Sequence, residues 1–152
     1  NGYGNGLNNI ILGNNSNNTI TGGLGNDIIN GGLGNDVLNG GSGADTFVFT
    51  YFGSSNFDTI QDFLTGTDKI QISAAAINSL IGRSASWGSF IIGNHNVNND
   101  AFDHIMFDNS NPLAKTLWFD QGNSTNQYQI ATFSTTFGVT NPNVVSADIL
   151  IV

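Results

Sequence analysis

The sequence is most distinctive for the residues that it lacks. Its 152 residues include no cysteine and no glutamate, and only three basic side chains, Lys69, Arg83 and Lys115. The absence of cysteine excludes a disulfide framework and a thiolate metal site. The shortage of basic residues excludes the positive patch that nucleic acid or another polyanion requires. No run approaches the roughly 18 apolar residues of a membrane-spanning helix, and the first residues are typical of turns rather than of a signal peptide.

The acidic residues are all aspartate and are concentrated in one region. The chain has 11 of them and a formal net charge of −8. Six fall between residues 27 and 68, namely Asp27, Asp36, Asp45, Asp58, Asp62 and Asp68. Carboxylates at this density repel one another, so we expect folding to depend on a cation that neutralises them.

Three nine-residue units follow one another without a gap, at residues 22–30, 31–39 and 40–48. Each has the form G-G-x-G-x-D-x-U-x, where U is a large apolar residue, and this is the calcium-binding nonapeptide pattern. The alternative is a series of ordinary turns, because Gly-Asn and Asn-Gly pairs are common in hairpins. A hairpin meander, however, requires neither an Asp at every ninth position nor a third glycine. The pattern therefore favours calcium, which binds roughly 6–8 oxygen ligands, both carboxylates and carbonyls.

The spacing within each unit predicts how the chain coils. Glycines at positions one, two and four permit a tight turn, and positions seven to nine form a short strand. Two units make one turn of a flattened coil of parallel strands, which rises about 4.8 Å per turn. Asp27 is then expected to stack on Asp45, eighteen residues later. The residues at position eight are expected to point inward, and these are Ile29, Leu38 and Phe47.

The candidate metal ligands are the carboxylates at position six and the glycines at positions two and four, whose carbonyls are expected to face inward. They are Asp27, Asp36, Asp45, Gly23, Gly25, Gly32, Gly34, Gly41 and Gly43. Two weaker units, at residues 4–12 and 13–21, have Asn9 and Asn18 where the later units have Asp. An Asn side chain offers an oxygen but no charge, so we expect these units to bind calcium weakly or not at all and to continue the coil as a cap. Because the chain starts inside this array, we interpret it as a fragment.

After Val48 the pattern changes to longer extended segments. Alternating residues predict three strands and then a short helix, at residues 46–50, 57–63, 69–73 and 74–81. Further strands are expected near 87–92, 102–108, 116–120, 128–134 and 148–152. The predicted fold is all-β: a calcium-binding parallel β-roll with its closing segment at 1–73, capped by an antiparallel β-sandwich-like lobe at 74–152.

The segments around the end of the repeats resemble a known family. Gly43–Phe49 (GADTFVF), Asp58–Phe63 (DTIQDF) and Gly66–Ser73 (GTDKIQIS) are similar to the C-terminal β-roll domain of serralysin-type secreted proteases. The same domain type occurs in the R-modules of mannuronan C5-epimerases and at the ends of other RTX exoproteins. The chain departs from the family at Gln71, where the family commonly has Asp.

The resemblance also implies further ligands. By that comparison, Asp62 and Asp68 complete a calcium site at the end of the roll, near Asp36. Asp58 is a further candidate, and the alternative for each of these residues is an N-cap or a turn.

The last five residues match a second pattern. Asp148 is followed by four hydrophobic residues, Ile149 to Val152, which is similar to the C-terminal signal of proteins exported by type I ABC transporters. The alternative is a final core strand. The two interpretations are compatible, because such a signal is read before the protein folds.

The sequence carries no recognisable catalytic constellation. His95 and His104 are too far apart for the zinc motif H-E-x-x-H, which also needs a glutamate that the chain lacks. No G-x-S-x-G nucleophile elbow is present. Asp103 beside His104 is better explained as surface sequence than as a catalytic dyad. We therefore expect no enzyme activity from this module.

These features predict a non-catalytic, calcium-binding RTX module at the C-terminus of a secreted bacterial protein, located extracellularly or at the cell surface. It is expected to fold on calcium after type I secretion, so its partners are an ABC exporter and an upstream passenger domain. The alternative is a carbohydrate- or surface-binding module of an extracellular enzyme or adhesin. In that case Tyr51, Trp87, Trp118 and Tyr128 are candidates for a sugar-stacking face, and the alternative is that these aromatic residues belong to the core. The scarcity of Lys and Arg argues against an anionic glycan such as alginate.

Overall fold

The chain folds almost entirely into β-strands. The computed structural model describes residues 1–51, 56–81, 87–92, 103–108, 114–120, 127–134 and 144–152. The strands are β1 (Gly2–Tyr3), β2 (Ile10–Asn14), β3 (Thr19–Leu24), β4 (Ile28–Gly32), β5 (Val37–Ser42), β6 (Thr46–Phe49), β7 (Asp58–Ile60), β8 (Lys69–Ile72), β9 (Trp87–Ile92), β10 (Asp103–Asp108), β11 (Ala114–Asp120), β12 (Gln127–Ser134) and β13 (Ile149–Ile151). The helices in the described part are α1 (Ala74–Ile81) and the 3-10 turn η1 (Ser146–Asp148).

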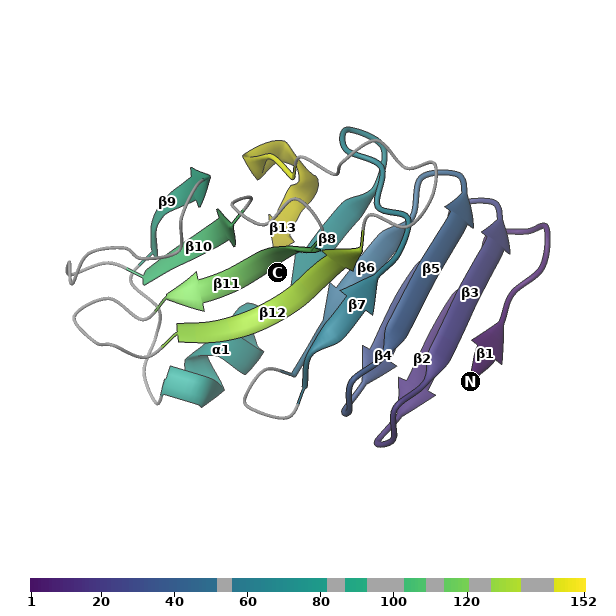
Figure 1. Cartoon of the computed structure of the whole chain (residues 1–152), viewed down its shortest axis with the longest axis horizontal. Helices are drawn as coiled ribbons and strands as arrows, with labels where there is room; N and C mark the ends of the chain where they lie inside the picture. The colour runs from purple at the N-terminus through teal and green to yellow at the C-terminus, as the bar shows by residue number, and fades with distance from the viewer. Residues whose placement is uncertain (52–55, 82–86, 93–102, 109–113, 121–126, 135–143) are drawn as a thin grey trace.

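Two sheets make up the architecture (Figure 1). Sheet A has the strand order β1-β3-β5-β7-β12-β11-β10-β9, and sheet B has the order β13-β8-β6-β4-β2. From β1 to β8, successive strands alternate between the two sheets, and neighbours within each sheet run parallel. The chain therefore winds as a flattened coil of parallel strands, which confirms the predicted β-roll.

One turn of the coil takes eighteen residues. Ile10 pairs with Ile28 in sheet B, and Thr19 pairs with Val37 in sheet A. The last turns are longer, because β5 and β7 are offset by 22 residues, with Val37 opposite Thr59. The offset between β6 and β8 is 23 residues. The extra residues enlarge the connecting loops and leave the strand pairing unchanged.

The residue at position eight of each unit points into the roll. Ile20, Ile29, Leu38 and Phe47 are at most 1% exposed, which confirms the predicted inward row. Ile11 in the first turn is only partly buried against them. Burying side chains of this size contributes roughly 1.5–3 kcal/mol each, so this row is the main apolar support of the coil.

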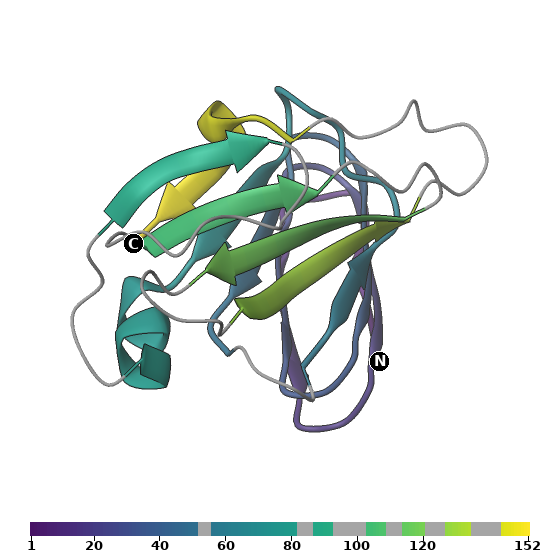
Figure 2. The ribbon, with the colours of Figure 1, turned by 60° about the vertical axis from the view of Figure 1, so that its left-hand side comes forward.

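The C-terminal strands extend both sheets of the roll (Figure 2). In sheet A, β12 lies parallel to β7, followed by the antiparallel pairs β12–β11 and β11–β10 and then by β9 parallel to β10. In sheet B, β13 lies parallel to β8. The rings of Phe63, Phe133 and Phe107 follow one another with edge contacts at 5.4 and 5.6 Å between centroids. The hydrophobic core is therefore continuous from the roll into the C-terminal strands.

The elements predicted beyond the repeats are present with small shifts of their ends. The later strands lie at 87–92, 103–108, 114–120, 127–134 and 149–151, and α1 covers the predicted 74–81. β7 ends at Ile60 rather than at Phe63, because the chain turns away at Asp62 toward a neighbouring loop. In the described part of the chain, no helix is long and apolar enough to span a membrane. Arg83, His95 and Asp100 lie outside the described residues.

Truncation of Leu38 to Ala is expected to destabilise the calcium-loaded protein by about 2–5 kcal/mol, because it leaves a cavity in the inward row. The matched control is Leu24→Ala in the preceding repeat. Leu24 is 61% exposed, so its truncation is expected to cost less than about 0.5 kcal/mol. Urea unfolding in saturating calcium measures both variants. Equal losses would contradict the assignment of position eight to the core.

Candidate metal-binding loops

Glycine-rich loops connect the two sheets at both edges of the roll. The glycines at positions two and four have positive φ angles between 96° and 142°, and they are Gly23, Gly25, Gly32, Gly34, Gly41 and Gly43. These backbone conformations are strained for residues with a Cβ. The loops therefore need glycine at these positions, as the repeat pattern predicts.

The glycine at position one has a different reason. Gly22, Gly31 and Gly40 do not adopt the left-handed conformation, so backbone freedom does not explain them and that part of the prediction is wrong. A Cβ on Gly31 would collide with the carboxylate of Asp36 in the same loop. The equivalent collision is present in the other two units. Position one is glycine because the side chain at position six occupies the space.

The aspartates of alternate units stack into a first column, which consists of Asn9, Asp27, Asp45 and Asp68. Each backbone N–H donates to the carboxylate of the next member. The bonds run from Asn9 N to Asp27 Oδ1 at 2.7 Å, from Asp27 N to Asp45 Oδ1 at 2.8 Å, and from Asp45 N to Asp68 Oδ1 at 3.0 Å. The predicted stacking of Asp27 on Asp45 is confirmed.

A second column on the opposite edge consists of Asn18, Asp36 and Asp58. Asn18 N donates to Asp36 Oδ1 at 2.7 Å, and Asp36 N donates to Asp58 Oδ1 at 3.0 Å. The prediction that Asp62 and Asp68 lie near Asp36 is therefore wrong, because Asp58 occupies that place and Asp68 belongs to the first column. The signal in the sequence was the repeated Asp-x-apolar triplet, which recurs at Asp58-Thr59-Ile60 and Asp68-Lys69-Ile70.

Asp62 binds backbone amides beside the first column. Its two oxygens accept from Gly40 N at 2.9 Å and from Gly41 N at 2.7 Å. It thereby holds the loop that carries Asp45. Its negative charge is one of the factors that raise the pKa of Asp45, behind burial, the largest factor.

Two carboxylate oxygens in these columns are buried without a hydrogen-bond partner in the described structure. They are Oδ2 of Asp27 and Oδ2 of Asp36, and both residues are only 1% exposed. A buried and unsatisfied anionic oxygen is strongly unfavourable. Each oxygen needs a positively charged partner. Among the described residues, no lysine or arginine forms an ion pair with Asp27 or Asp36.

The Asn residue at the start of each column has a hydrogen-bond partner for its side-chain oxygen within its own loop. Asn9 Oδ1 accepts from Asn5 N at 2.9 Å, and Asn18 Oδ1 accepts from Asn14 N at 2.9 Å. At the far end of the first column, Asp68 Oδ2 accepts from Leu64 N at 2.7 Å. Asn9, Asn18 and Asp68 thus have backbone donors for these oxygens, whereas Oδ2 of Asp27 and of Asp36 does not.

Burial also raises the pKa of the stacked carboxyls. Desolvation raises the pKa of Asp58 to about 7 and that of Asp68 to about 6, against backbone hydrogen bonds that lower both values. Burial likewise raises the pKa of Asp36 and Asp45. The folded loops therefore disfavour the negative charge that these groups carry at neutral pH.

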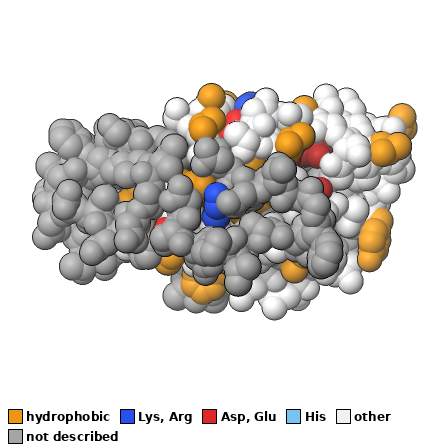
Figure 3. All heavy atoms as spheres, turned by 45° about the horizontal axis from the view of Figure 1, so that its top comes forward, with side chains coloured by type: hydrophobic (Ala, Val, Ile, Leu, Met, Phe, Trp, Pro, Cys, Tyr) orange, Lys and Arg blue, Asp and Glu red, His pale blue; other side chains and the backbone are white. Residues whose placement is uncertain are grey.

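The donor set suits calcium. Within the described residues, no three Asp, Glu, His or Cys side chains converge on one point, so a cation between two loops meets paired carboxylates and must take its other oxygens from the backbone. Calcium accepts such mixed carboxylate and carbonyl shells, whereas zinc and copper favour nitrogen and sulfur. Figure 3 shows a surface of mainly uncharged polar groups over the roll, with hydrophobic side chains scattered among them.

Fold and site together define a class of protein, a parallel β-roll whose stacked glycine loops present paired carboxylates to a hard cation. The RTX calcium-binding nonapeptide repeat is the family whose model matches, in four copies, over residues 3–38 and 21–48. Residues 3–48 are therefore RTX calcium-binding repeats.

Two solved structures from Azotobacter vinelandii resemble the chain. The AlgE6R2 subunit of its mannuronan C5-epimerase shares 21% identity at a TM-score of 0.54, over 98% of this chain and 91% of that one. The AlgE6R3 subunit shares 20% identity at a TM-score of 0.46, over 93% of this chain and 79% of that one. The first of these likenesses confirms the fold. No curated protein matches the chain.

The raised pKa values predict that the metal-free roll is more stable at mildly acidic pH. Folded Asp58 holds a proton that the unfolded chain has released between about pH 4 and 7, and folded Asp68 does so between about pH 4 and 6. Stability then falls as the pH rises through this window. In chelator, circular dichroism is expected to show more β-structure at about pH 5.5 than at about pH 8, and saturating calcium is expected to abolish or reverse the difference. Loss of structure on acidifying the chelated protein would contradict the prediction.

Proposed function

We propose that this module binds calcium between its stacked loops and folds as it does so. The observation that carries the proposal is the pair of buried, unpartnered carboxylate oxygens, Asp27 Oδ2 and Asp36 Oδ2. Each lies in a column where the adjacent member is also acidic. Calcium would supply the charge that the fold itself does not provide, so metal binding and folding are linked.

The columns define which loop pairs bind the ion most strongly. Three of the backbone-to-carboxylate hydrogen bonds join two aspartates: Asp27 with Asp45, Asp45 with Asp68, and Asp36 with Asp58. Asp62 lies beside the second of these pairs, and the glycines at positions two and four, Gly23, Gly25, Gly32, Gly34, Gly41 and Gly43, supply carbonyls. The contacts of Asn9 with Asp27 and of Asn18 with Asp36 carry one charge fewer, so they form weaker sites.

Secretion follows as part of the same proposal. Extracellular calcium modules work at roughly 10⁻⁴–10⁻³ M, so the acidic repeats would stay unfolded where calcium is scarce and fold outside. The C-terminal end, which we propose as the signal for a type I ABC exporter, forms β13 in the folded chain, and Val152 N donates to Ile72 O at 3.0 Å. The backbone of the signal would therefore be unpaired only before folding, although Leu150, Ile151 and Val152 keep exposed side chains. An upstream passenger domain and an extracellular or cell-surface location complete this proposal.

We also propose that residues 1–73 and 74–152 act as a roll and its cap. The roll's last two strands, β7 and β8, each pair with a strand of the second part, β12 and β13. This arrangement supports a cap that covers the end of the coil. No catalytic role is proposed for either part.

The second candidate function is binding of a carbohydrate or surface partner by an extracellular enzyme or adhesin. Two of the four aromatic candidates have other roles, since Tyr128 stacks on Phe119 at 6.3 Å and Trp118 Nε1 donates to Thr116. The side chain of Trp87 is not among the described parts of the structure. Tyr51 is 51% exposed and lines a pocket, and this observation keeps the second candidate in place.

Calcium titration tests the proposed function with a matched pair of charge changes. Asp36→Asn removes the charge of a buried, unpartnered carboxylate and is expected to weaken calcium-induced folding by about tenfold or more in calcium concentration, which equals about 1.4 kcal/mol. Asn18→Asp adds a charge to the same column and is expected to shift the transition in the opposite direction. Circular dichroism monitors both variants, with magnesium as the control ion.

The outcome that contradicts the proposal is equally specific. A chelated wild-type protein with the full β-spectrum and melting temperature of the calcium-loaded form would exclude coupled folding. Magnesium demands octahedral geometry and retains its waters, so it is expected to induce folding less well than calcium. Equal effects of the two ions would exclude this selectivity.

A further inference from the structure

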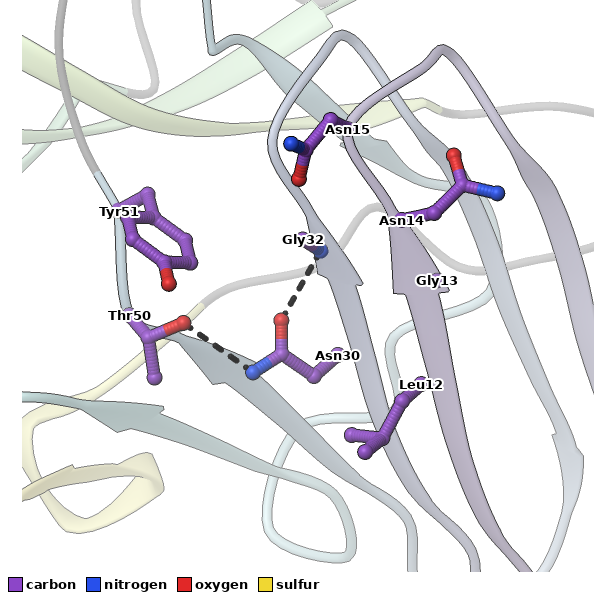
Figure 4. Close-up of a pocket in the computed structure, with 8 residues that line it drawn as sticks. All are labelled: Leu12, Gly13, Asn14, Asn15, Asn30, Gly32, Thr50 and Tyr51. Atoms are coloured by element: carbon purple, nitrogen blue, oxygen red, sulfur yellow. Dashed lines mark hydrogen bonds between the residues drawn. The ribbon is translucent and has the colours of Figure 1, made fainter.

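A pocket of about 250 Å³ lies on the outward side of sheet B, beside the second column (Figure 4). It arises from the register of three neighbouring strands. Asn14 of β2 pairs with Gly32 of β4, and Thr50 follows the end of β6 on the other side. Strands are about 4.8 Å apart, so the flanking residues stand about two strand spacings apart with no side chain between them. The glycine required by the repeat thus forms the floor of a hollow.

The polar groups of the pocket are held in fixed positions. Asn30 Oδ1 accepts from Gly32 N at 3.0 Å, and Asn30 Nδ2 donates to Thr50 Oγ1 at 3.2 Å. An amide has two hydrogens and a hydroxyl can both accept and donate. The second Nδ2 hydrogen and the Thr50 hydroxyl hydrogen can therefore serve a ligand. The pocket is pre-organised, because the same contacts fix the side chains before anything binds.

Apolar surface borders these polar groups. Tyr51 is 51% exposed and Leu12 is 71% exposed. Figure 4 shows Leu12 on β2 and Tyr51 in the segment that follows β6, with Asn30 between them. A tyrosine ring offers a flat apolar face together with a hydroxyl. None of the residues that line the pocket is charged. The pocket thus combines amide and hydroxyl groups with an aromatic face and an aliphatic side chain.

We propose that this pocket binds a neutral saccharide unit. A sugar ring presents hydroxyls that suit the amide and hydroxyl groups, and a C–H face that suits an aromatic ring. The volume of the pocket lies below the roughly 300–1,000 Å³ of sites for drug-sized ligands. The pocket therefore has room for about one or two sugar rings. An acidic sugar or a phosphate is excluded, because the lining has no cation and the chain has a net charge of −8.

The inference rests on the proposed function in one respect. Asn15 and Gly32, which line the pocket, belong to the loops of the second column, where Asp36 stacks on Asn18 and Asp58. Calcium that orders these loops also orders one wall and the floor of the pocket. Saccharide affinity is therefore expected to depend on calcium.

The test is a glycan array of neutral glucan, mannan and galactan oligosaccharides with oligouronates as the anionic counterparts, probed with the calcium-loaded full chain. Hits among the neutral sugars are then titrated by calorimetry. Tyr51→Ala is expected to weaken binding by at least about tenfold, because it removes the stacking face. Thr50→Val keeps the size of the side chain and is expected to weaken binding severalfold by removing the hydroxyl. Tyr3→Ala is the matched control, since Tyr3 is 77% exposed outside the pocket, and it is expected to leave binding unchanged.

Three results would overturn the inference: no neutral sugar binds, the oligouronates bind better, or Tyr51→Ala binds as well as Tyr3→Ala. Circular dichroism of the same samples separates this inference from the proposed function. A variant that completes the calcium transition and loses the sugar supports the pocket. A protein that folds without calcium and binds neutral sugar refutes the coupled folding alone, and one that folds on calcium without binding any sugar refutes the pocket alone.

Discussion

The rest of the roll depends on the stacking of one aspartate on the next. In each column, one carboxylate oxygen accepts the backbone N–H of the preceding turn, as Asp45 does from Asp27 at 2.8 Å. That bond sets the spacing of the loops in register with the strands. The second oxygen of Asp27 and of Asp36 has no partner in the described structure. The same side chain therefore aligns successive turns and leaves a buried charge, which calcium would neutralise in the function that we propose.

The ends of the columns show how the chain limits this dependence. At the start, Asn9 and Asn18 accept N–H groups from their own loops, so the first turns carry no uncompensated charge. At the other end, Lys69 forms an ion pair with Asp148 at 3.3 Å. Asp148 is fully buried and also accepts from Gly66 N at 3.1 Å. One of only three basic residues is thus placed where sheet B receives its last strand, which ties that strand to the end of the roll.

The repeats made part of this structure predictable, because every ninth residue has one environment. The period predicts the eighteen-residue turn, and position eight predicts the buried row from Ile29 to Phe47. The pairing of Asp36 with Asp58 could not be predicted by period, since the loop after β6 adds four residues to the turn. The pairing of β7 with β12 joins segments far apart in the sequence, and no local pattern specifies it. The pocket at Gly32 depends on which side chains the neighbouring strands place beside a glycine, and this is known only once the register is known.

Position six directly precedes the short strand that contains position eight, so each loop carboxylate lies two residues from a core side chain. Asp27 and Ile29 are both buried, and both contact residues of the next turn. Asp27 N donates to Asp45, and Ile29 pairs with Phe47. A single turn therefore gains neither a carboxylate partner nor apolar contacts. In repeat structures of this kind, stability is a sum over neighbouring turns, and the outermost turns need caps. The last turn finds its neighbours in β12 and β13. In the function that we propose, calcium binding in the loops and docking of the C-terminal strands would therefore support the same folding transition.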